Sequence, residues 1–368
     1  MKILIVSSYE PVPRLERRVN LYKRCNAECN LIYLNRSGDT SKDKYSHLGI
    51  RIFEFSRKIR HGDYFKRLFA YKHFRNFIKK ILDNDYDFIH IQDLDMFLLL
   101  YKICVKKNIK IIYEVRDIHK ILIDKQKGLK KFVQHRLIKN ETKALKQVER
   151  IIVTSNKFYE RFYFNRIDKE KVIYIPNIPD LNAFKNYKRK DHNNAFTVGF
   201  IGKLRYKDQI INLINTCEKT DTCLFLAGSI ENGEIEKYIK EKNIQVFGKY
   251  SYVKDISLLY SSIDCVFSVY DSNQNNVTIA LPNKLYEAVY CELPIIVSKN
   301  TYVGEIVEKY GVGLAVDSTD ELELIDAINK LKSDKLFYER IVENCRKIKT
   351  ILLNNEGECL LKDLIVNG

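Results

Sequence analysis

The stretch Leu281-Pro-Asn-Lys-Leu-Tyr-Glu-Ala-Val-Tyr-Cys-Glu-Leu-Pro-Ile-Ile-Val-Ser298 reads as a helix followed by a buried strand. Pro282 suits the first helical turn, where its missing N–H would have no partner in any case. Three further residues would turn their backbone N–H groups out of the helix start, where anions bind well: Asn283, Lys284 and Leu285. Glu287 follows about one turn later. The stretch therefore predicts a site for a phosphate-bearing ligand with a hydroxylated ring beside its phosphate.

Strands and helices alternate along the rest of the chain, which predicts α/β domains with parallel, doubly wound sheets. The predicted strands include Lys2–Ser7, Cys223–Ala227, which ends at Gly228, and Ile244–Phe247. The alternation stops at the polar segment 185–194 and then restarts. We therefore expect two Rossmann-like domains that face a central crevice, where the carboxyl ends of such strands bind ligands. The expected parts are an N-terminal domain at 1–180, a linker at 181–195, a second domain at 196–345, and a C-terminal helical segment at 346–368 that packs back on the first domain.

The composition fits a globular protein. The chain has 368 residues, of which 45% are hydrophobic and 30% charged, and this length exceeds what one ordinary core supports. No run of 18 apolar residues is present, so we expect no membrane span. The apolar start, 1–8, is too short for a signal peptide and is expected to be the first strand. The nine cysteines include no C-x-x-C pair, which favours reduced thiols in a cytosol over a zinc site.

The net charge of +16 belongs entirely to the first half of the chain. Residues 1–180 contain 39 Lys and Arg against 21 Asp and Glu, a balance of +18. Residues 181–368 contain 24 against 26, a balance of −2. This asymmetry suggests that the first domain faces a polyanion, either nucleic acid or an anionic membrane surface. A solvated basic face is the alternative.

Two loops that follow predicted strands contain candidate site residues. The turn Phe200-Ile-Gly-Lys-Leu-Arg-Tyr-Lys207 has a glycine, Gly202, that lets the backbone approach a ligand. Its cations would bind a diphosphate, or else they are solvated: Lys203, Arg205 and Lys207. In the first domain, Arg116 and Asp117 directly follow a strand on the predicted crevice side. They are either a catalytic pair or a structural salt bridge.

Seven segments, in this order, resemble motifs of the family-4 retaining glycosyltransferases of the GT-B architecture. Their resemblance to motifs such as "VHAHDLD", "VIPNGVD" and "PxKxxEA" extends over nearly the whole chain. They are Pro13-Arg-Leu-Glu-Arg-Arg18, Ile89-His-Ile-Gln-Asp-Leu-Asp95, Ile112-Tyr-Glu-Val-Arg-Asp-Ile118, Val153-Thr-Ser155, Tyr174-Ile-Pro-Asn177, Gly202 and Pro282–Glu287.

The resemblance implies a donor site in the second domain and an acceptor site in the first. The donor would be a nucleotide-diphosphate sugar, with UDP favoured, and Glu287 would contact the ribose. The basic turn after Gly202 would bind the diphosphate. Arg116 falls where many members have a histidine in the catalytic region. Transfer would proceed with retention to a glycan or a lipid-linked glycan, in the synthesis of a cell-surface polysaccharide such as a capsule.

The chain departs from the family pattern at several positions. The family often has a second glutamate upstream of the one that matches Glu287, and Ile279 stands there. Lys203 replaces the usual arginine after the turn glycine, and Asp208 replaces a usual lysine. The Gly-Gly turn after the first strand is replaced by Ser7-Ser-Tyr-Glu10. A catalytically degenerate protein that binds a sugar nucleotide therefore remains an alternative.

The predicted mechanism needs no metal and no cofactor. Departure of the sugar builds negative charge on the β-phosphate, and cations beside the phosphate stabilise such charge. Arg205, Lys207 and the helix start at Pro282 would supply this stabilisation. Asp93-Leu-Asp95 has the spacing of a metal site, but it matches the strand motif of the first domain instead.

The basic half suggests peripheral contact with the inner face of the cell membrane, in the cytoplasm. The predicted helix Tyr64–Ile81 combines cations with an apolar stripe, which is typical of interfacial helices and also of ordinary core helices. A second basic cluster is Lys125–Lys131. The stripe consists of Tyr64, Leu68, Tyr71, Phe74, Ile78 and Ile81.

Two rivals from other classes fit less well. A nucleic-acid-binding protein would explain the charge, but no helix-turn-helix, zinc-finger or RNP signature is present, so we expect no nucleic acid partner. Non-hydrolysing sugar-nucleotide epimerases share the architecture, but their carboxylate pattern is missing from the sequence.

Overall fold

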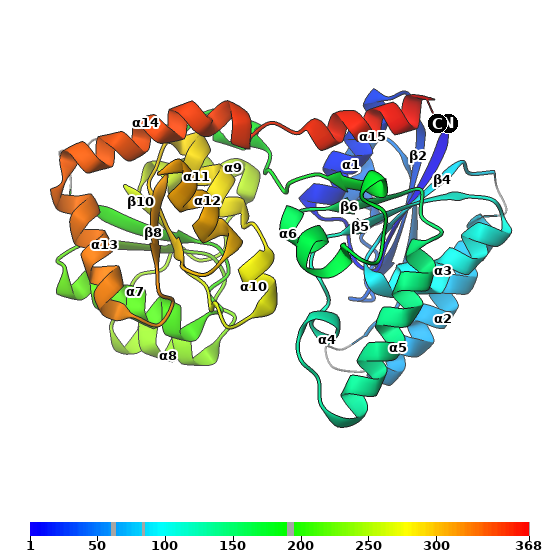
Figure 1. Ribbon diagram of the computed structural model, residues 1–368, viewed down its shortest axis with the longest axis horizontal. Helices are drawn as coiled ribbons and strands as arrows, with labels where there is room; N and C mark the ends of the chain where they lie inside the picture. The colour runs from blue at the N-terminus through cyan, green and yellow to red at the C-terminus, as the bar shows by residue number, and fades with distance from the viewer. Residues whose placement is uncertain (60–63, 83–84, 190–194, 368) are drawn as a thin grey trace. The chain divides into compact units, whose positions relative to one another are not determined.

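The computed structural model describes residues 1–59, 64–82, 85–189 and 195–367. The chain forms two compact units: unit 1 consists of Met1–Pro176 and Asn355–Gly368, and unit 2 of Asn177–Asn354 (Figure 1). Each unit is a parallel β-sheet with helices on both faces, which confirms the predicted pair of Rossmann-like α/β domains.

The sheet of unit 1 has the strand order β3-β2-β1-β4-β5-β6-β7, and every neighbouring pair is parallel. Its central strands are continuous apolar runs because both faces are covered by helices. The strand order reverses between β1 and β4, so the carboxyl ends of these two strands border a crevice. The strands are β1 (Lys2–Ser7), β2 (Glu28–Asn35), β3 (Arg51–Ser56), β4 (Phe88–Gln92), β5 (Lys110–Val115), β6 (Arg150–Val153) and β7 (Val172–Tyr174).

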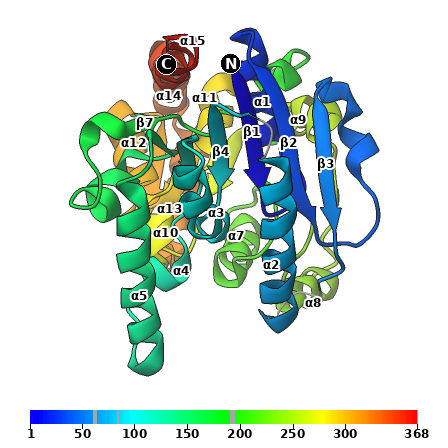
Figure 2. The same ribbon diagram turned by 90° about the vertical axis from the view of Figure 1, so that its right-hand side faces the viewer.

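The helices of unit 1 form two layers (Figure 2). Helices α2, α3 and α5 lie side by side on one face, and α1 and α15 lie together on the other, where α15 also contacts β7. The helices are α1 (Pro13–Arg24), α2 (Tyr64–Ile81), α3 (Leu94–Lys106), α4 (Lys120–Ile123), α5 (Gly128–Leu145), α6 (Asn156–Phe158) and α15 (Glu356–Asn367), with short 3₁₀ or π turns at Lys42–Leu48, Tyr159–Tyr163 and Lys169–Lys171.

The apolar stripe of α2 belongs to the core of unit 1. Tyr71, Phe74, Ile78 and Ile81 are all buried, and the ring of Phe74 lies 5.5 Å from that of Phe55 on β3. The side chains of residues 64 and 68 lie outside the described part. The core-helix interpretation therefore holds for the described members of this stripe, and the expectation that it contacts a membrane is wrong for them.

A buried ion network links α1, β4, β5 and α15 inside unit 1. The guanidinium of Arg18 lies 3.3 Å from the carboxylate of Glu114 and 3.4 Å from that of Glu358. Glu114 also lies 2.9 Å from Nε2 of His90, whose Nδ1 is 2.6 Å from the hydroxyl of Tyr22. Burial opposes the charge of Glu114, but Arg18 and His90 outweigh it and hold the pKa of Glu114 well below its ordinary value.

The sheet of unit 2 has the order β12-β11-β10-β8-β9, again with parallel neighbours. The order reverses between β8 and β10, which makes this the crevice of unit 2. The predicted strand at 244–247 is wrong, because this segment forms only an isolated bridge between Leu226 and Val246. The strands are β8 (Thr197–Ile201), β9 (Cys223–Ala227), β10 (Cys265–Ser268), β11 (Ile295–Ser298) and β12 (Gly313–Val316).

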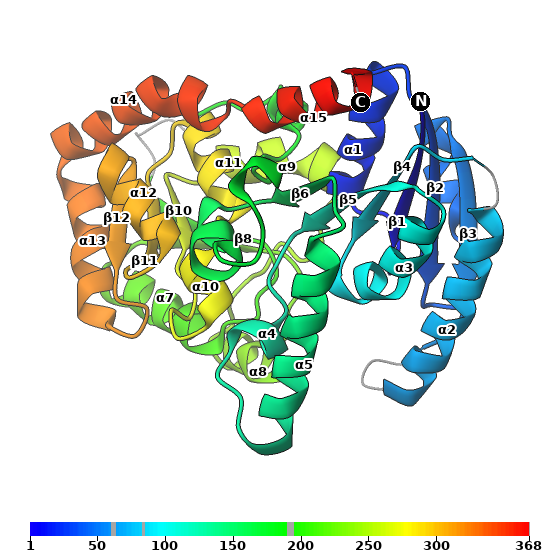
Figure 3. The ribbon, with the colours of Figure 1, turned by 45° about the vertical axis from the view of Figure 1, so that its right-hand side comes forward.

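Helices also cover both faces of this second sheet (Figure 3). Helix α7 contacts both α8 and α13, and α11 packs against α14. The helices are α7 (Lys207–Lys219), α8 (Gly233–Glu241), α9 (Tyr252–Ser261), α10 (Asn275–Ile279), α11 (Asn283–Cys291), α12 (Tyr302–Tyr310), α13 (Glu321–Ser333) and α14 (Lys335–Leu352), with a 3₁₀ turn at Leu181–Phe184.

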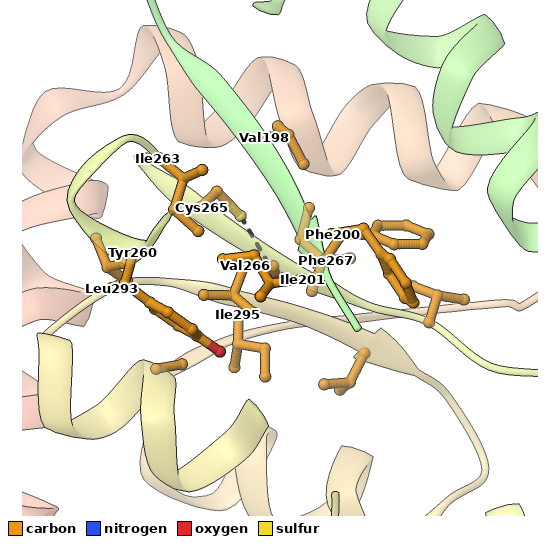
Figure 4. Close-up of a cluster of buried hydrophobic side chains, with 14 of the residues drawn as sticks. Val198, Phe200, Ile201, Tyr260, Ile263, Cys265, Val266, Phe267, Leu293 and Ile295 are labelled. Carbon is orange, nitrogen blue, oxygen red and sulfur yellow. Dashed lines mark hydrogen bonds between the residues drawn. The ribbon is translucent and has the colours of Figure 1, made fainter. Parts of the chain in front are cut away.

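The core of unit 2 forms around β8, β10 and β11 (Figure 4). Phe200, Phe267 and Ile295 of these strands are buried together. A Cβ at Gly199 would lie 2.4 Å from the side chain of Ile263, so a larger residue in β8 would force this buried isoleucine to move. Tight packing of this kind fixes the strand ends that border the crevice.

The domain boundaries differ from those predicted. The described part of the expected linker, 181–195, belongs to unit 2. Phe184 is buried in that core, and Tyr187 donates a hydrogen bond to the carbonyl of Cys291. Residues 190–194 lie outside the described part. In the expected C-terminal segment, α14 continues in unit 2 up to Leu352, and only α15 joins unit 1.

Candidate functional site

The turn after β8 lies at the crevice of unit 2 and needs glycine at two positions. Gly202 has a φ of +152°, and Gly228, which follows β9, has a φ of +133°. A Cβ at Gly228 would lie 1.8 Å from the carbonyl oxygen of Gly202. The N–H of Gly202 donates to Ala227 at 2.8 Å. The two turns therefore pack backbone against backbone, and Gly202 lies just past the carboxyl end of β8, where the strand order reverses.

The ammonium group of Lys284 reaches this glycine turn from α11. A Cβ at Gly202 would lie 2.8 Å from Nζ of Lys284. The ammonium donates to the hydroxyl of Tyr270 at 3.0 Å and lies 4.7 Å from the ring centre of Phe200. Lys284 is only 8% exposed, and within the described residues it forms no ion pair with a carboxylate. A buried cation without a counter-charge is costly, so this site is suited to an anionic ligand.

The three cations predicted to hold a diphosphate are placed differently. Lys203 is exposed and pairs with Glu231 at 2.6 Å, and Lys207 pairs with Glu234 of α8. Arg205 is exposed and lies 5.0 Å from the ring centre of Tyr206. These cations thus lie at the surface of the turn, and two of them already have carboxylate partners. The buried cation at this turn is Lys284. The sequence predicts only a backbone N–H from this residue, whereas its side-chain ammonium also lies at the site.

The start of α11 corrects the predicted anion site in two details. Helix α11 begins at Asn283, and Pro282 is the residue before it. The N–H of Leu285 donates to the carbonyl of Pro282 at 3.1 Å, so the predicted role of Leu285 as an anion donor is wrong. The side chain of Asn283 accepts a hydrogen bond from Asn177 at 2.5 Å. The remaining predicted donors are the N–H groups of Asn283 and Lys284.

Glu287 is held by tyrosines. It is 4% exposed, and its two carboxylate oxygens accept hydrogen bonds from Tyr252 at 2.7 Å and from Tyr260 at 2.5 Å. Burial raises the pKa of Tyr260 far above its ordinary value, and the charge of Glu287 raises it further. A carboxylate can accept about four hydrogen bonds, so Glu287 keeps capacity for a ligand hydroxyl. Ile279, at the end of α10, is buried.

A second candidate site is a polar cavity of about 230 Å³ at the crevice of unit 1. Residues that follow β1, β2, β4 and β5 line it, as expected for the carboxyl edge of a parallel sheet. Arg116 and Asp117, both predicted from the sequence, are among them. The charged and aromatic lining residues include Tyr9, Arg36, Arg67, Asp93, Asp95, Glu114, Arg116, Asp117 and His119.

Asp93 is the centre of this cavity's hydrogen bonds. It accepts from the hydroxyls of Ser8 at 3.0 Å and Tyr9 at 2.8 Å and from Arg116 at 2.7 Å. The guanidinium of Arg116 lies 4.2 Å from the ring centre of Tyr9. Burial raises the pKa of Asp93 to about 6, which the Ser8 hydroxyl only partly opposes. Asp93 also has a φ of +76°, a strained conformation that is found mainly at functional sites.

The other arginines of this cavity are also anchored. Arg67 pairs with Asp95 at 2.6 Å, and Arg36 donates to the hydroxyl of Tyr71 at 2.8 Å. Asp93 and Asp95 are therefore each bound to an arginine. Across the described residues, no three His, Cys, Asp or Glu side chains are grouped so that they could hold a metal ion.

The sequence did not indicate that tyrosines contact Glu287 and Lys284, or that Asp93 accepts several hydrogen bonds in the cavity of unit 1. Tyr252, Tyr260 and Tyr270 lie far from Glu287 and Lys284 in the sequence or on other elements, and tyrosine is common throughout this chain. Gly228 was a better signal, because it ends a predicted strand next to the glycine turn. Asp93 stood inside a quoted motif, but its strain and its three donors depend on the fold.

Two family models match the chain, and together they cover residues 24–348. The model described as "Glycosyltransferase Family 4" matches residues 24–183. The model described as "Glycosyl transferases group 1" matches residues 180–348. Together they extend across both crevices.

The chain is a family-4 glycosyltransferase of GT-B architecture.

Solved structures share the fold of this glycosyltransferase along its whole length. HepE of Anabaena in complex with UDP is 15% identical with a TM-score of 0.71, and the match covers 100% of this chain and 99% of HepE. Sucrose-phosphate synthase of Thermosynechococcus elongatus is 16% identical with a TM-score of 0.74, covering 100% and 98%. WaaG, a glycosyltransferase of lipopolysaccharide biosynthesis, is 13% identical with a TM-score of 0.69, covering 100% of both chains.

A search of curated protein sequences gave no significant match.

In the described parts of the chain, the helices are all too short or too polar to cross a membrane.

Proposed function

We propose that this glycosyltransferase moves a sugar from a UDP-sugar, bound at the crevice of unit 2, to a glycan acceptor bound at the cavity of unit 1. The observation that carries the proposal is the buried ammonium of Lys284 at the Gly202 turn. It is a cation that lacks a counter-charge in the described structure, and a diphosphate would supply one.

The chemistry assigns Lys284 a role in the transition state. Transfer breaks the bond between the anomeric carbon of the sugar and the β-phosphate oxygen, and the bonding electron pair stays on that oxygen. A cation that is already in place and shielded from water stabilises such developing charge strongly. Lys284 and the N–H groups at the start of α11 are such groups, whereas Arg205 and Lys207 act from the more exposed side of the turn.

The nucleoside is proposed to lie beside Glu287, which would accept hydrogen bonds from the ribose hydroxyls. Uracil is favoured as the base because solved structures of the similarly folded HepE contain UDP and UDP-glucose. Tyr252 and Tyr260 hold the carboxylate in place. A positioned hydrogen-bonding group discriminates more sharply than a mobile one, because binding costs it little conformational entropy.

The acceptor is proposed to be a neutral sugar of a glycan or lipid-linked glycan. The cavity of unit 1 alternates arginines with carboxylates, and two of its arginines already have carboxylate partners. Sugar hydroxyls both donate and accept hydrogen bonds, so they match this alternation better than a phosphate does. Arg116 and Asp93 would orient the attacking hydroxyl.

The wider setting follows from the family and the charge distribution. We propose transfer with retention and without a metal or other cofactor, in the synthesis of a cell-surface polysaccharide such as a capsule. The enzyme would work in the cytoplasm at the inner face of the membrane. The charge excess of +18 in residues 1–180 supports this location, because anionic lipids attract basic surfaces.

A nucleotide panel tests the proposal. UDP, GDP, ADP and CMP are added separately, and thermal unfolding is followed. Ligand at about 100 times its Kd stabilises by about 2.7 kcal/mol, so UDP should raise the unfolding temperature of unit 2 by several degrees. Release of UDP from UDP-sugars, with EDTA present, then measures turnover. The proposal is wrong if none of the nucleotides stabilises the chain.

A catalytically degenerate binding protein is the second candidate, and the observation in its favour is Ile279. This buried apolar side chain stands where the family often has a glutamate, and it offers no polar group to a donor sugar. The same experiment separates the two candidates. Stabilisation by UDP together with no UDP release from any UDP-sugar, with a broad range of acceptors present, would favour binding alone.

A further inference from the structure

The N-terminal half of α5 exposes an apolar stripe. Leu129 is 80% exposed, Phe132 63% and Val133 39%. Residues at positions i, i+3 and i+4 share one face of a helix, so these three side chains form one continuous strip. Large apolar side chains that gather on an exposed helix face usually mark a binding surface.

Cations surround this stripe, and acidic residues are missing from it. Between Asp124 and Glu141 the sequence contains no Asp or Glu. The charged side chains there are all basic: Lys125, Lys127, Lys130, Lys131, Arg136 and Lys139, with His135 among them. These six Lys and Arg residues are all exposed. An apolar strip flanked by cations on one helix is the arrangement of a helix that lies in a membrane interface.

The stripe stands on a rigid base. Glu141, Ala144 and Leu145 in the C-terminal half of α5 are buried, and Glu141 accepts a hydrogen bond from Arg166 at 2.5 Å. Near the other end, the side-chain amide of Gln134 donates to the carbonyl of Asp124 at 2.8 Å. The helix is therefore fixed before it meets a partner, which lowers the entropic cost of binding.

The position of α5 relates it to the cavity of unit 1. Its N-terminal end reaches past the carboxyl ends of the strands (Figures 2 and 3). The chain runs from the cavity wall at Arg116 to His119 directly into α4, which contacts α5. The exposed stripe and the cavity thus lie at the same edge of the sheet.

Helix α2 shows that charge alone does not make such a surface. It too is basic and is in the same layer, but its described apolar stripe faces the core. Phe69 is its one described exposed aromatic residue, at 61%.

We propose that the segment Lys125–Lys139, which includes the N-terminal half of α5, docks on an anionic lipid bilayer. Leu129, Phe132 and Val133 enter the interface between headgroups and acyl chains, and the lysines bind lipid phosphates. Docking then presents the cavity of unit 1 to acceptors that are anchored in the same bilayer. This last step rests on the proposed function, whereas the docking itself does not.

The absence of tryptophan from the chain allows a direct test on the full-length protein. Phe132→Trp introduces a single fluorophore in the stripe, and Phe69→Trp is the matched control on α2. Vesicles contain equal parts of phosphatidylcholine and phosphatidylglycerol, with lipids brominated in their acyl chains. We expect a blue shift and bromine quenching for Phe132→Trp and neither change for Phe69→Trp.

Vesicle co-sedimentation measures the two contributions separately. Lys130→Gln with Lys131→Gln should weaken binding by about fivefold per charge, and Leu129→Ser with Phe132→Ser by about tenfold or more. Lys79→Gln with Lys80→Gln on α2 and Leu336→Ser on α14 are the matched controls and should retain binding. All these sites are exposed, and thermal unfolding checks that each variant folds.

Three outcomes would overturn the proposal. They are equal binding to purely phosphatidylcholine vesicles, equal losses from the α2 control pair, and binding of oligonucleotides through α5 without vesicle binding. The last outcome would indicate a nucleic acid partner. Failure to dock would leave UDP stabilisation and UDP release unchanged, so the docking and the proposed transferase activity fail separately.

Discussion

The two candidate sites treat buried cations in opposite ways. In the cavity of unit 1, Arg116 and Arg67 are paired with Asp93 and Asp95. At the crevice of unit 2, Lys284 is more deeply buried and has a tyrosine hydroxyl and aromatic rings as its neighbours. Paired charges hold each other in fixed positions. An unpaired buried charge lowers the free energy of unfolding until a ligand of opposite charge binds. The first site suits a neutral ligand and the second an anion.

The largest expected effect tests the unpaired cation. Lys284→Met should lower the rate of transfer by about 10²–10³-fold, because it removes a buried donor that stabilises the leaving β-phosphate. The free energy of unfolding without ligand should stay equal or rise, since the variant no longer buries a charge. Steady-state UDP release and urea unfolding measure the two quantities. A large loss of stability with unchanged affinity for UDP would show that Lys284 is structural.

The next effect tests the opposite case, a paired buried charge in the lining of the cavity of unit 1. Glu114→Gln should lower the free energy of unfolding by about 3 kcal/mol, because it leaves Arg18 and His90 without their buried carboxylate. Glu358→Gln is the control, since that carboxylate is 22% exposed and its loss should cost less than about 1 kcal/mol. Urea unfolding measures both. Equal effects would mean that burial does not set the strength of this network.

Asp93 is expected to give a smaller effect that depends on pH. Its pKa rises from 3.8 to about 6 on folding, so the folded chain binds this proton more tightly than the unfolded chain does. The contribution of Asp93 to stability is therefore present at low pH and lost as pH rises through about 6. Asp93→Asn should remove this loss and stabilise unit 1 by up to about 3 kcal/mol at neutral pH relative to acid pH.

Urea unfolding at a series of pH values, with the wild-type chain beside the variant, measures this difference. Transfer should also fall below about pH 6 in the wild type, because a protonated Asp93 no longer neutralises Arg116. A variant whose stability follows the same pH curve as the wild type would contradict the assignment.

The smallest expected effect is that of Lys207→Met. This side chain is 40% exposed and pairs with Glu234, so a diphosphate would have to compete with that carboxylate and with water. We expect a change in transfer of less than about threefold. Kinetics under the conditions used for Lys284→Met provide the comparison. An effect as large as that of Lys284→Met would mean that the basic turn closes on the donor when it binds.

The sequence predicted the fold well because parallel strands leave a strong pattern. The run Lys2–Ser7 and the helix 64–81 have the predicted bounds. Errors fell where the apolar pattern is ambiguous. Residues 244–247 are apolar enough for a strand but form a single bridge, and the polar stretch after Pro176 continues into buried residues of unit 2.

The site was predicted only in part. Glycine at 202 and a helix start near Pro282 follow from local rules, and both are present at the crevice of unit 2. Which cation is buried is decided by packing: Lys284 points to Gly202 because Phe200 and Tyr270 form its surroundings. Local sequence could not distinguish it from Lys203. The same limit applies to α2 and α5, whose compositions are alike and whose exposures differ.

Helix α15 is synthesised after the whole of unit 2, yet it belongs to unit 1. Leu361 and Ile365 of this helix are buried in one cluster with Ile175, and Gly357 lies so close to Tyr174 that a Cβ would be 1.9 Å from its carbonyl oxygen. Domains generally fold as units while the ribosome extends the chain. Unit 2 is one continuous segment, so its synthesis is complete before that of unit 1. Until α15 leaves the ribosome, the nascent unit 1 exposes the apolar surface that this helix later covers. Chaperones recognise such a surface.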